Sequence, residues 1–201
     1  MTVKRLFDVV VSAAGLAVLA PLLVVIPVLI RLDSPGPALF RQTRIGRGFK
    51  PFQIIKFRTM TSKTGRDRRP LTVAGDAAIT RVGHWLRQTK LDELPQLLNV
   101  LRGDMSLVGP RPEVPQYVEM FRDRFALVLR VRPGITDPAS LRYRNESALL
   151  ALAPDPELEY RQRILPEKLR LSTEYSEHST FGSDLALIVE TVFGTRQRKP
   201  S

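Results

Sequence analysis

The chain has 201 residues, enough for one domain or for one domain with a membrane anchor. It contains no cysteine and only two histidines, which excludes disulfides, thiolate chemistry and a metal site built mainly from histidine. Its formal net charge of +11 favours partners rich in negative charge, namely nucleic acid, anionic lipid or phosphorylated substrates.

An apolar run extends from Leu6 to Ile30 and is long enough to cross the hydrocarbon core of a bilayer. Pro21 and Pro27 interrupt it, and a proline inside a helix removes a backbone donor and kinks the helix. Lys4 and Arg5 precede the run and further arginines follow it, so the positive-inside rule places both flanks on the cytoplasmic side. We therefore predict a re-entrant helix that bends near Pro21, with a straight spanning helix as the alternative.

The rest of the chain predicts an α+β fold, mostly helical with one small β-hairpin. Leu39–Arg44 and Phe52–Arg58 read as strands that flank Gly46-Arg47-Gly48, which is the pattern of a hairpin. Met105–Val108 is a candidate short strand. Apolar residues at helical spacing predict further helices at Ile79–Gln88, Glu113–Arg130, Glu157–Ile164, Pro166–Glu177 and Ser183–Phe193.

The segment from Thr89 to Pro112 holds the candidate catalytic groups. Its leucines recur at helical spacing and a proline at position 95 fits only a first turn, so we predict a helix from near Asp92 to a C-cap at Gly103. Asp92 and Glu93 then lie at the positive end of the helix dipole, where carboxylates stay ionised. Such a pair serves as a nucleophile or holds a divalent cation, although Asp is also an ordinary helix N-cap.

This segment resembles the hallmark sequence of the monotopic phosphoglycosyl transferases, the bacterial sugar transferase family. The similarity comprises Asp92-Glu93 followed by Leu-Pro-Gln, then Gly-Asp-Met-Ser from position 103 and Gly-Pro-Arg-Pro from position 109. It continues on both sides and covers nearly the whole chain. Enzymes of this family move a phospho-sugar from a nucleotide diphosphate sugar to a polyprenyl phosphate, and they use a re-entrant helix broken by proline.

The sequence departs from the family pattern at two places. Ala20 stands where the family commonly has a serine before the bending proline, which removes a hydroxyl that satisfies a freed carbonyl. The run Asp137-Pro138-Ala139-Ser140 replaces the usual glycine and small residues in the region expected to shape the sugar pocket. The identity of the sugar therefore does not carry over from the family.

The resemblance implies a two-step reaction that begins with attack of Asp92 on the β-phosphate of a UDP-sugar. UMP leaves, and polyprenyl phosphate then attacks the phospho-sugar held on the carboxylate. Mg²⁺ would be held by Asp92 and Glu93. The implied phosphate-binding cations are Lys56, Arg58, Arg87, Arg111 and Arg144. Simpler structural roles remain open, since Lys56 and Arg58 suit the solvated face of a strand and Arg111 suits a rigid proline turn.

We therefore expect a re-entrant membrane helix and turn at residues 1–36, a catalytic domain at 37–195 and a basic tail at 196–201. The expected location is the cytoplasmic face of the bacterial inner membrane, where the enzyme would begin glycan or exopolysaccharide assembly. Its expected partners are a UDP-sugar, polyprenyl (undecaprenyl) phosphate and membrane lipid, without nucleic acid, and a homodimer is left open. The alternative is a membrane-anchored basic protein that binds nucleic acid, which explains the charge but not the carboxylate pair.

Overall fold

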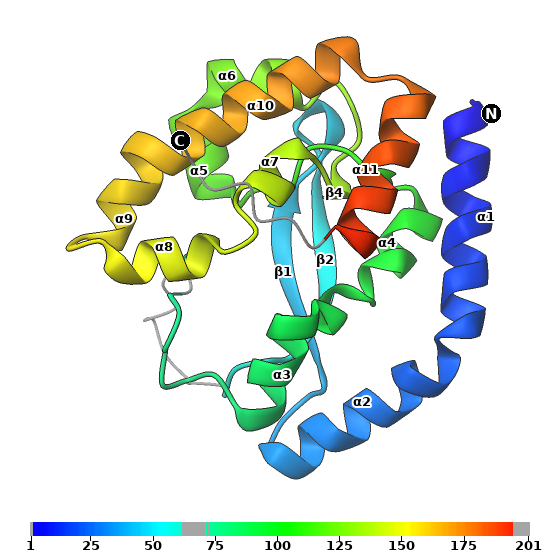
Figure 1. The fold of residues 1–201 in the computed structure, drawn as a ribbon, viewed down its shortest axis with the longest axis vertical. Coiled ribbons are helices and arrows are strands. Elements are labelled where there is room, and N and C mark those ends of the chain that lie inside the picture. The colour runs from blue at the N-terminus through cyan, green and yellow to red at the C-terminus, as the bar shows by residue number, and fades with distance from the viewer. Residues whose placement is uncertain (1, 62–70, 72, 195–201) are drawn as a thin grey trace.

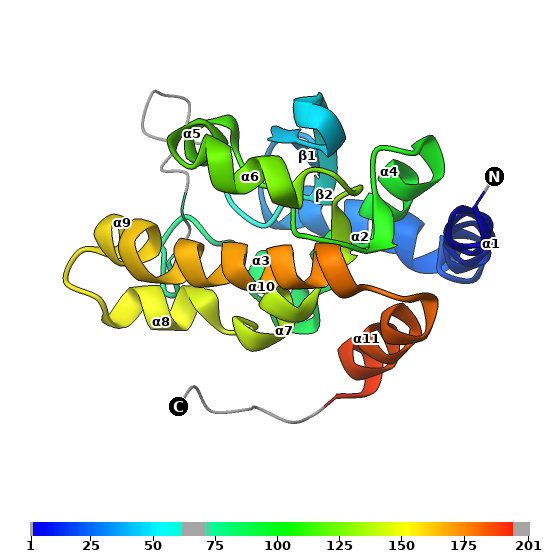
Figure 2. The same ribbon diagram turned by 90° about the horizontal axis from the view of Figure 1, so that it is seen from above.

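The computed structural model describes residues 2–61, 71 and 73–194, so the predicted basic tail at 196–201 lies outside the described residues. Helices surround a central two-stranded hairpin (Figure 1), so the prediction of a mostly helical fold with a small antiparallel sheet is confirmed. Figure 2 shows α1 (Val3–Val18) nearly end-on at one edge of the molecule. The helices α8 (Glu146–Leu152) and α9 (Pro156–Glu159) lie at the opposite edge.

The N-terminal apolar run forms two helices, α1 and α2 (Ala20–Asp33), bent by 62° at Leu19. The break lies just before Pro21, which has no N–H to donate and whose ring crowds the carbonyl four residues earlier. The bend predicted near Pro21 is therefore present, even with Ala20 in place of serine. Among the described residues, neither helix alone reaches the length and hydropathy of a membrane span, whereas the bent pair does by length and composition.

The hairpin consists of β1 (Leu39–Ile45) and β2 (Pro51–Phe57), which pair antiparallel as predicted. A short 3₁₀ turn at Arg47–Phe49 joins them, and Gly48 takes the positive φ of 65° that this turn requires. The helix α4 (Gln96–Arg102) is attached to β2 through a buried amide. Asn99 accepts from the N–H of Ile55 (3.0 Å) and donates to the carbonyl of Gln53 (2.8 Å).

Between α3 (Arg81–Thr89) and α4 the chain makes a 3₁₀ turn at Leu91–Glu93. The prediction that α4 begins near Asp92 is therefore wrong, because the helix begins at Gln96. Pro95 has no N–H for the carbonyl of Leu91, and the neighbouring amides bond three residues back instead, as in Leu94 N–H to Leu91 O (3.2 Å). The predicted C-cap is confirmed, since Gly103 has a φ of 91°.

The short strand predicted at Met105–Val108 is present as β3 (Ser106–Val108), but its parallel partner β4 (Gly134–Thr136) was not predicted. The backbone just after β3 approaches the start of β4 closely at a pair of glycines. A Cβ atom on Gly134 would lie 2.0 Å from the backbone nitrogen of Gly109, so this approach excludes any side chain there. The loop that carries Arg111 leaves from this fixed point.

The single helix predicted at Glu113–Arg130 is wrong, since the structure has α5 (Pro115–Met120) and α6 (Arg122–Val128). Phe121 leaves helical geometry (φ −121°, ψ 36°) while its side chain packs against the largest core cluster. The remaining elements, besides α8 and α9, are α7 (Pro138–Arg142), a π-helical turn (Tyr160–Ile164), α10 (Leu165–His178) and α11 (Phe181–Phe193).

Candidate active site

Glu93 is the centre of a cluster of three charged side chains from three separate elements. Its Oε1 accepts from Lys56 Nζ of β2 at 2.8 Å and also from Arg111 Nη2. Arg111 Nη1 donates to Oε2 at 3.3 Å, so the guanidinium grips both carboxylate oxygens. The side chain of Glu93 is 13% exposed, that of Lys56 18% and that of Arg111 34%. The cluster therefore reaches solvent mainly through Arg111.

The electrostatics of the cluster keep Glu93 ionised. Burial opposes ionisation, but Arg111 and Lys56 outweigh it and hold the pKa of Glu93 well below its ordinary value. Glu93 in turn raises the pKa of Arg111. Burial lowers the pKa of Lys56 against the attraction of Glu93, and the charge of Arg111 adds to the lowering. Glu93 is thus a fixed anion whose oxygens are occupied by two cations.

Asp92, the neighbouring carboxylate, is in a different environment. Its Oδ1 is buried and has no hydrogen-bond partner among the described residues. Burial raises the pKa of Asp92, as does the negative charge of Glu93, while Lys56, Lys90 and Arg87 act in the opposite direction. The expectation that a helix dipole keeps this group ionised is wrong. No α-helix starts at Asp92, and its side chain caps none.

Two polar side chains lie within five residues of Asp92 in the sequence, one predicted and one missed. Arg87, on the last turn of α3, donates from Nε to Thr59 Oγ1 at 2.8 Å; burial lowers its pKa, and the nearby charge of Asp92 opposes that shift. Gln96, the first residue of α4, is only 1% exposed, and its Nε2 has no partner within the described ranges. Helical spacing could not have pointed to Gln96, because Asp92 lies in the 3₁₀ turn and not in the same helix.

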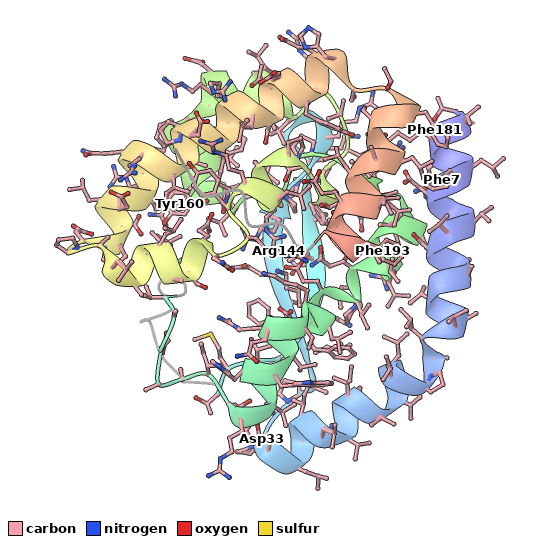
Figure 3. The ribbon with its side chains drawn as sticks, viewed as in Figure 1. Phe7, Asp33, Arg144, Tyr160, Phe181 and Phe193 are labelled. Atoms are coloured by element: carbon pink, nitrogen blue, oxygen red, sulfur yellow. The ribbon has the colours of Figure 1, made fainter. Side chains whose placement is uncertain are left out.

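The other two predicted cations have contacts elsewhere. Arg58 is 5% exposed and donates to carbonyls at the end of α2, including those of Pro35 (2.7 Å) and Ser34 (2.6 Å). Arg144 donates to the carbonyls of Gly194 (2.8 Å) and Thr191 (3.2 Å) at the end of α11, where Figure 3 also labels Phe193. The structure therefore places Lys56, Arg87 and Arg111 at the carboxylate pair, and it gives Arg58 and Arg144 helix-end contacts.

The site offers one free carboxylate oxygen beside several cations. Across the described parts of the chain, no group of three or more His, Cys, Asp or Glu side chains is placed to hold a metal. Mg²⁺ often takes only one or two protein carboxylates and completes its shell with water and substrate phosphates. The Asp92 carboxylate suits that role, whereas both oxygens of Glu93 accept from Arg111 or Lys56. The arrangement suits a phosphorylated ligand.

Comparison with known proteins also indicates phosphorylated substrates. A sequence profile described as "Bacterial sugar transferase" matches residues 1–198. A UDP-glucose:undecaprenyl-phosphate glucose-1-phosphate transferase of Caulobacter vibrioides is 42% identical over 193 residues, covering 94% of this chain and 68% of its own length. A protein of the same name from Escherichia coli is 36% identical over 196 residues, covering 94% of this chain and 39% of its own length.

A relative from Aeromonas hydrophila carries a different sugar in its name. This UDP-N-acetylgalactosamine-undecaprenyl-phosphate N-acetylgalactosaminephosphotransferase is 41% identical over 137 residues, covering 67% of this chain and 32% of its own length. The chain thus spans about two thirds of the Caulobacter relative and less than two fifths of the other two. The similarity extends to relatives that differ in the sugar they are named for.

Proposed function

Because the chain belongs to the bacterial sugar transferase family, we propose that it transfers a phospho-sugar from a UDP-sugar to undecaprenyl phosphate and releases UMP. The names of the relatives at 36–42% identity support both substrates. Those names include two sugars, so the proposal is stated for UDP-sugars as a class. No observation favours the nucleic-acid alternative, and the basic surface is accounted for by phosphates and anionic lipid.

The observation that carries the proposal is the free oxygen of Asp92 beside a cluster of cations. In the first step Asp92 Oδ1 attacks the β-phosphorus of the UDP-sugar. The oxygen–phosphorus bond forms while the bond to the bridging oxygen breaks, and UMP leaves with that oxygen. In the second step a phosphate oxygen of undecaprenyl phosphate attacks the same phosphorus and releases Asp92 as a carboxylate. The product is an undecaprenyl diphosphate sugar.

The neighbouring side chains position the phosphates and balance their charge. Glu93 holds Arg111 and Lys56 in place, and the N–H groups of both that do not bond Glu93 remain for phosphate oxygens. Arg87 is anchored through Nε, which leaves its terminal nitrogens for the leaving group. The raised pKa of Asp92 reflects a desolvated carboxylate, and a desolvated nucleophile has less hydration to lose on attack.

Mg²⁺ fits this site with Asp92 as its protein ligand, and when bound it would offset charge on the diphosphate. The structural support is that no ion pair within the described residues occupies the Asp92 carboxylate, which leaves its second oxygen for the metal beside the Oδ1 that attacks phosphorus. Glu93 supports that ligand indirectly, by holding cations rather than by contributing a free oxygen.

A membrane-surface location follows from the two substrates, one soluble and one confined to lipid. We assign membrane entry and return to the bent pair α1 and α2, with residues 37–195 as the catalytic domain on the cytoplasmic face. This topology keeps Lys4 and Arg5 on the same side as the arginines that follow α2, as the positive-inside rule requires.

The test is UMP release by the purified full chain, incubated with Mg²⁺, undecaprenyl phosphate and each UDP-sugar of a panel. We expect UMP and a lipid-linked diphosphate sugar with at least one donor. Release of UDP instead of UMP would mean transfer of the sugar without its phosphate and would contradict the proposal. Turnover that survives Asp92→Asn would contradict the assigned nucleophile.

A further inference from the structure

A cavity of about 240 Å³ lies away from Asp92, at the other end of the hairpin. Figure 1 shows the hairpin turn near α10, while the open end of the hairpin is near α3. The segments that line the cavity are the start of α1, the hairpin turn, β3, the chain after α6, the last turn of α10 and the residue that follows α10. Its lining includes Lys4, Arg5, Arg47, Arg130, Arg132 and Ser179.

The positive charge of this cavity is only partly neutralised. Lys4 is paired with Asp184, but none of the four lining arginines takes part in a salt bridge within the described residues. Asp8 is the only carboxylate that lines the described cavity. Its oxygens accept from Ser106 Oγ (2.9 Å) and from the N–H of Leu107 (3.1 Å). The cavity therefore has a clear excess of positive charge.

Two of the four arginines hydrogen-bond backbone carbonyls, and the side chains of the other two do not. Arg5 donates to the carbonyls of Val100 (2.6 Å) and Leu101 (3.0 Å), and Arg132 donates to the carbonyl of Gly103 (3.0 Å). Both therefore fix the end of α4. The side chains of Arg47 and Arg130 are exposed, and in the described part of the chain they make no hydrogen bond or ion pair. These two guanidinium groups are free to bind an anion at the cavity mouth.

The helices beside the cavity indicate which kind of anionic molecule it suits. On α1, Val3 and Leu6 are 74% and 56% exposed, and α11 shows a similar exposed apolar face. The two helices contact each other close to Asp8 and Ser179 of the cavity lining, where the rings of Phe7 and Phe181 pack edge to face with centroids 5.2 Å apart (Figure 3). A cationic cavity between two exposed apolar helix faces matches a molecule with an anionic head and apolar tails.

We propose that this cavity binds the headgroup of one anionic phospholipid at the membrane surface. Its phosphodiester accepts charge-assisted hydrogen bonds from Arg47 and Arg130, and its acyl chains run along the apolar faces of α1 and α11. The bound lipid fixes the depth at which the start of α1 sits in the interface. Because binding needs no turnover, the site is independent of the reaction at Asp92 and is tested separately from it.

The experiment measures binding of dihexanoyl phosphatidylglycerol to the detergent-solubilised full chain by calorimetry. It compares the wild type with the double variant Arg47→Gln, Arg130→Gln. A matched control, Arg124→Gln, Arg163→Gln, removes the same charge from exposed positions that do not line the cavity. We expect one lipid per chain, and affinity about 25-fold weaker in the cavity variant, about fivefold for each arginine. The control should change affinity by less than about twofold.

Two further ligands distinguish the sources of phosphate. Inorganic phosphate should bind wild type and the cavity variant with equal affinity, since any binding at Asp92 is unaffected. Dihexanoyl phosphatidylcholine should bind wild type much more weakly than dihexanoyl phosphatidylglycerol does. Equal losses in the cavity variant and its control would overturn the proposal in favour of diffuse attraction. Loss of inorganic phosphate binding in the cavity variant would assign the cavity to a soluble anion and would overturn it as well.

Discussion

The substitution Asp92→Asn separates the chemistry of this carboxylate from its contribution to folding. Because burial and Glu93 raise the pKa of Asp92, its ionised form destabilises the folded chain at neutral pH. A neutral amide of the same shape removes that penalty. The new N–H groups must find partners, and one left unpaired costs about 1 kcal/mol. We expect a melting temperature within about 4 °C of wild type, or above it.

The rate should respond very differently. An amide at position 92 has no carboxylate oxygen for attack on phosphorus, so the covalent step is lost. We expect UMP release to fall at least about 10³-fold, which corresponds to about 4 kcal/mol of activation free energy. Wild type mixed with a UDP-sugar and Mg²⁺, but without undecaprenyl phosphate, should gain one phospho-sugar on the peptide that contains Asp92. The variant should show no such adduct by mass spectrometry.

The matched control is Asp155→Asn at the start of α9. Asp155 caps that helix by accepting from the N–H groups of Glu157 and Leu158, and asparagine caps as well as aspartate. This control should keep both stability and turnover. An adduct on another residue, or an Asp92→Asn protein that still releases UMP at more than about a tenth of the wild-type rate, would refute the assignment.

Three further predictions concern the cation cluster, acid stability and topology. Arg111→Lys loses the bidentate hydrogen bonds to Glu93, so turnover should fall about tenfold or more. The control Arg122→Lys, at an exposed position, should not change turnover. Equal turnover of Arg111→Lys and wild type would mean that Arg111 has only a structural role in its proline turn. Arg44 and Lys168 outweigh burial and lower the pKa of Glu113, so its contribution to stability is present above pH 4.5 and is lost as pH falls through the lowered pKa. Thermal unfolding of Glu113→Gln should therefore depend less on pH below 4.5 than wild type, and equal dependence would contradict this. Single cysteines at Thr2 and Lys50 should react with an impermeant reagent only from the cytoplasmic side, and labelling of position 2 from outside would exclude re-entry.

The sequence predicted the features that depend on local backbone chemistry. Pro21 marks the bend between α1 and α2 because the missing N–H acts within one helical turn. Gly103 ends α4 because it takes a positive φ at little cost, and glycines in the connecting turn separate the strands of the hairpin. The carboxylate pair, Lys56 and Arg111 were also found from the sequence, and the structure brings all of them together.

What the sequence did not predict depends on contacts between distant segments. Arg58 reads like the other basic residues of its strand, and only the packing of β2 against the end of α2 places it on backbone carbonyls. Arg144 is placed on the end of α11 in the same way, across 50 residues of sequence. The strand β4 has only three residues and shows no periodic pattern, since its pairing with β3 and the close approach of Gly109 and Gly134 define it.

The contacts of the N-terminal helices show that the proposed membrane segment packs into the fold that holds the carboxylate pair. From α1, Asp8 accepts from the backbone of β3, which leads directly to the Arg111 loop. The N-terminal helix also supplies Arg5, which holds the last carbonyls of α4, the helix that follows Asp92. On α2, Ile26 is buried in a core cluster with Leu86 of α3, and the leucines on either side of the carboxylate pair pack against it.

Removal of residues 2–33 would therefore do more than remove the proposed membrane anchor. The N–H of Leu107 and the carbonyls of Val100 and Leu101 would lose the partners that the N-terminal helices supply, and each such buried group left unpaired costs about 1–3 kcal/mol. Those groups lie on α4, which follows Asp92, and on β3, which leads to the Arg111 loop. In the proposed topology, insertion of α1 and α2 therefore helps to hold Asp92 and Arg111 in place for the proposed transfer reaction.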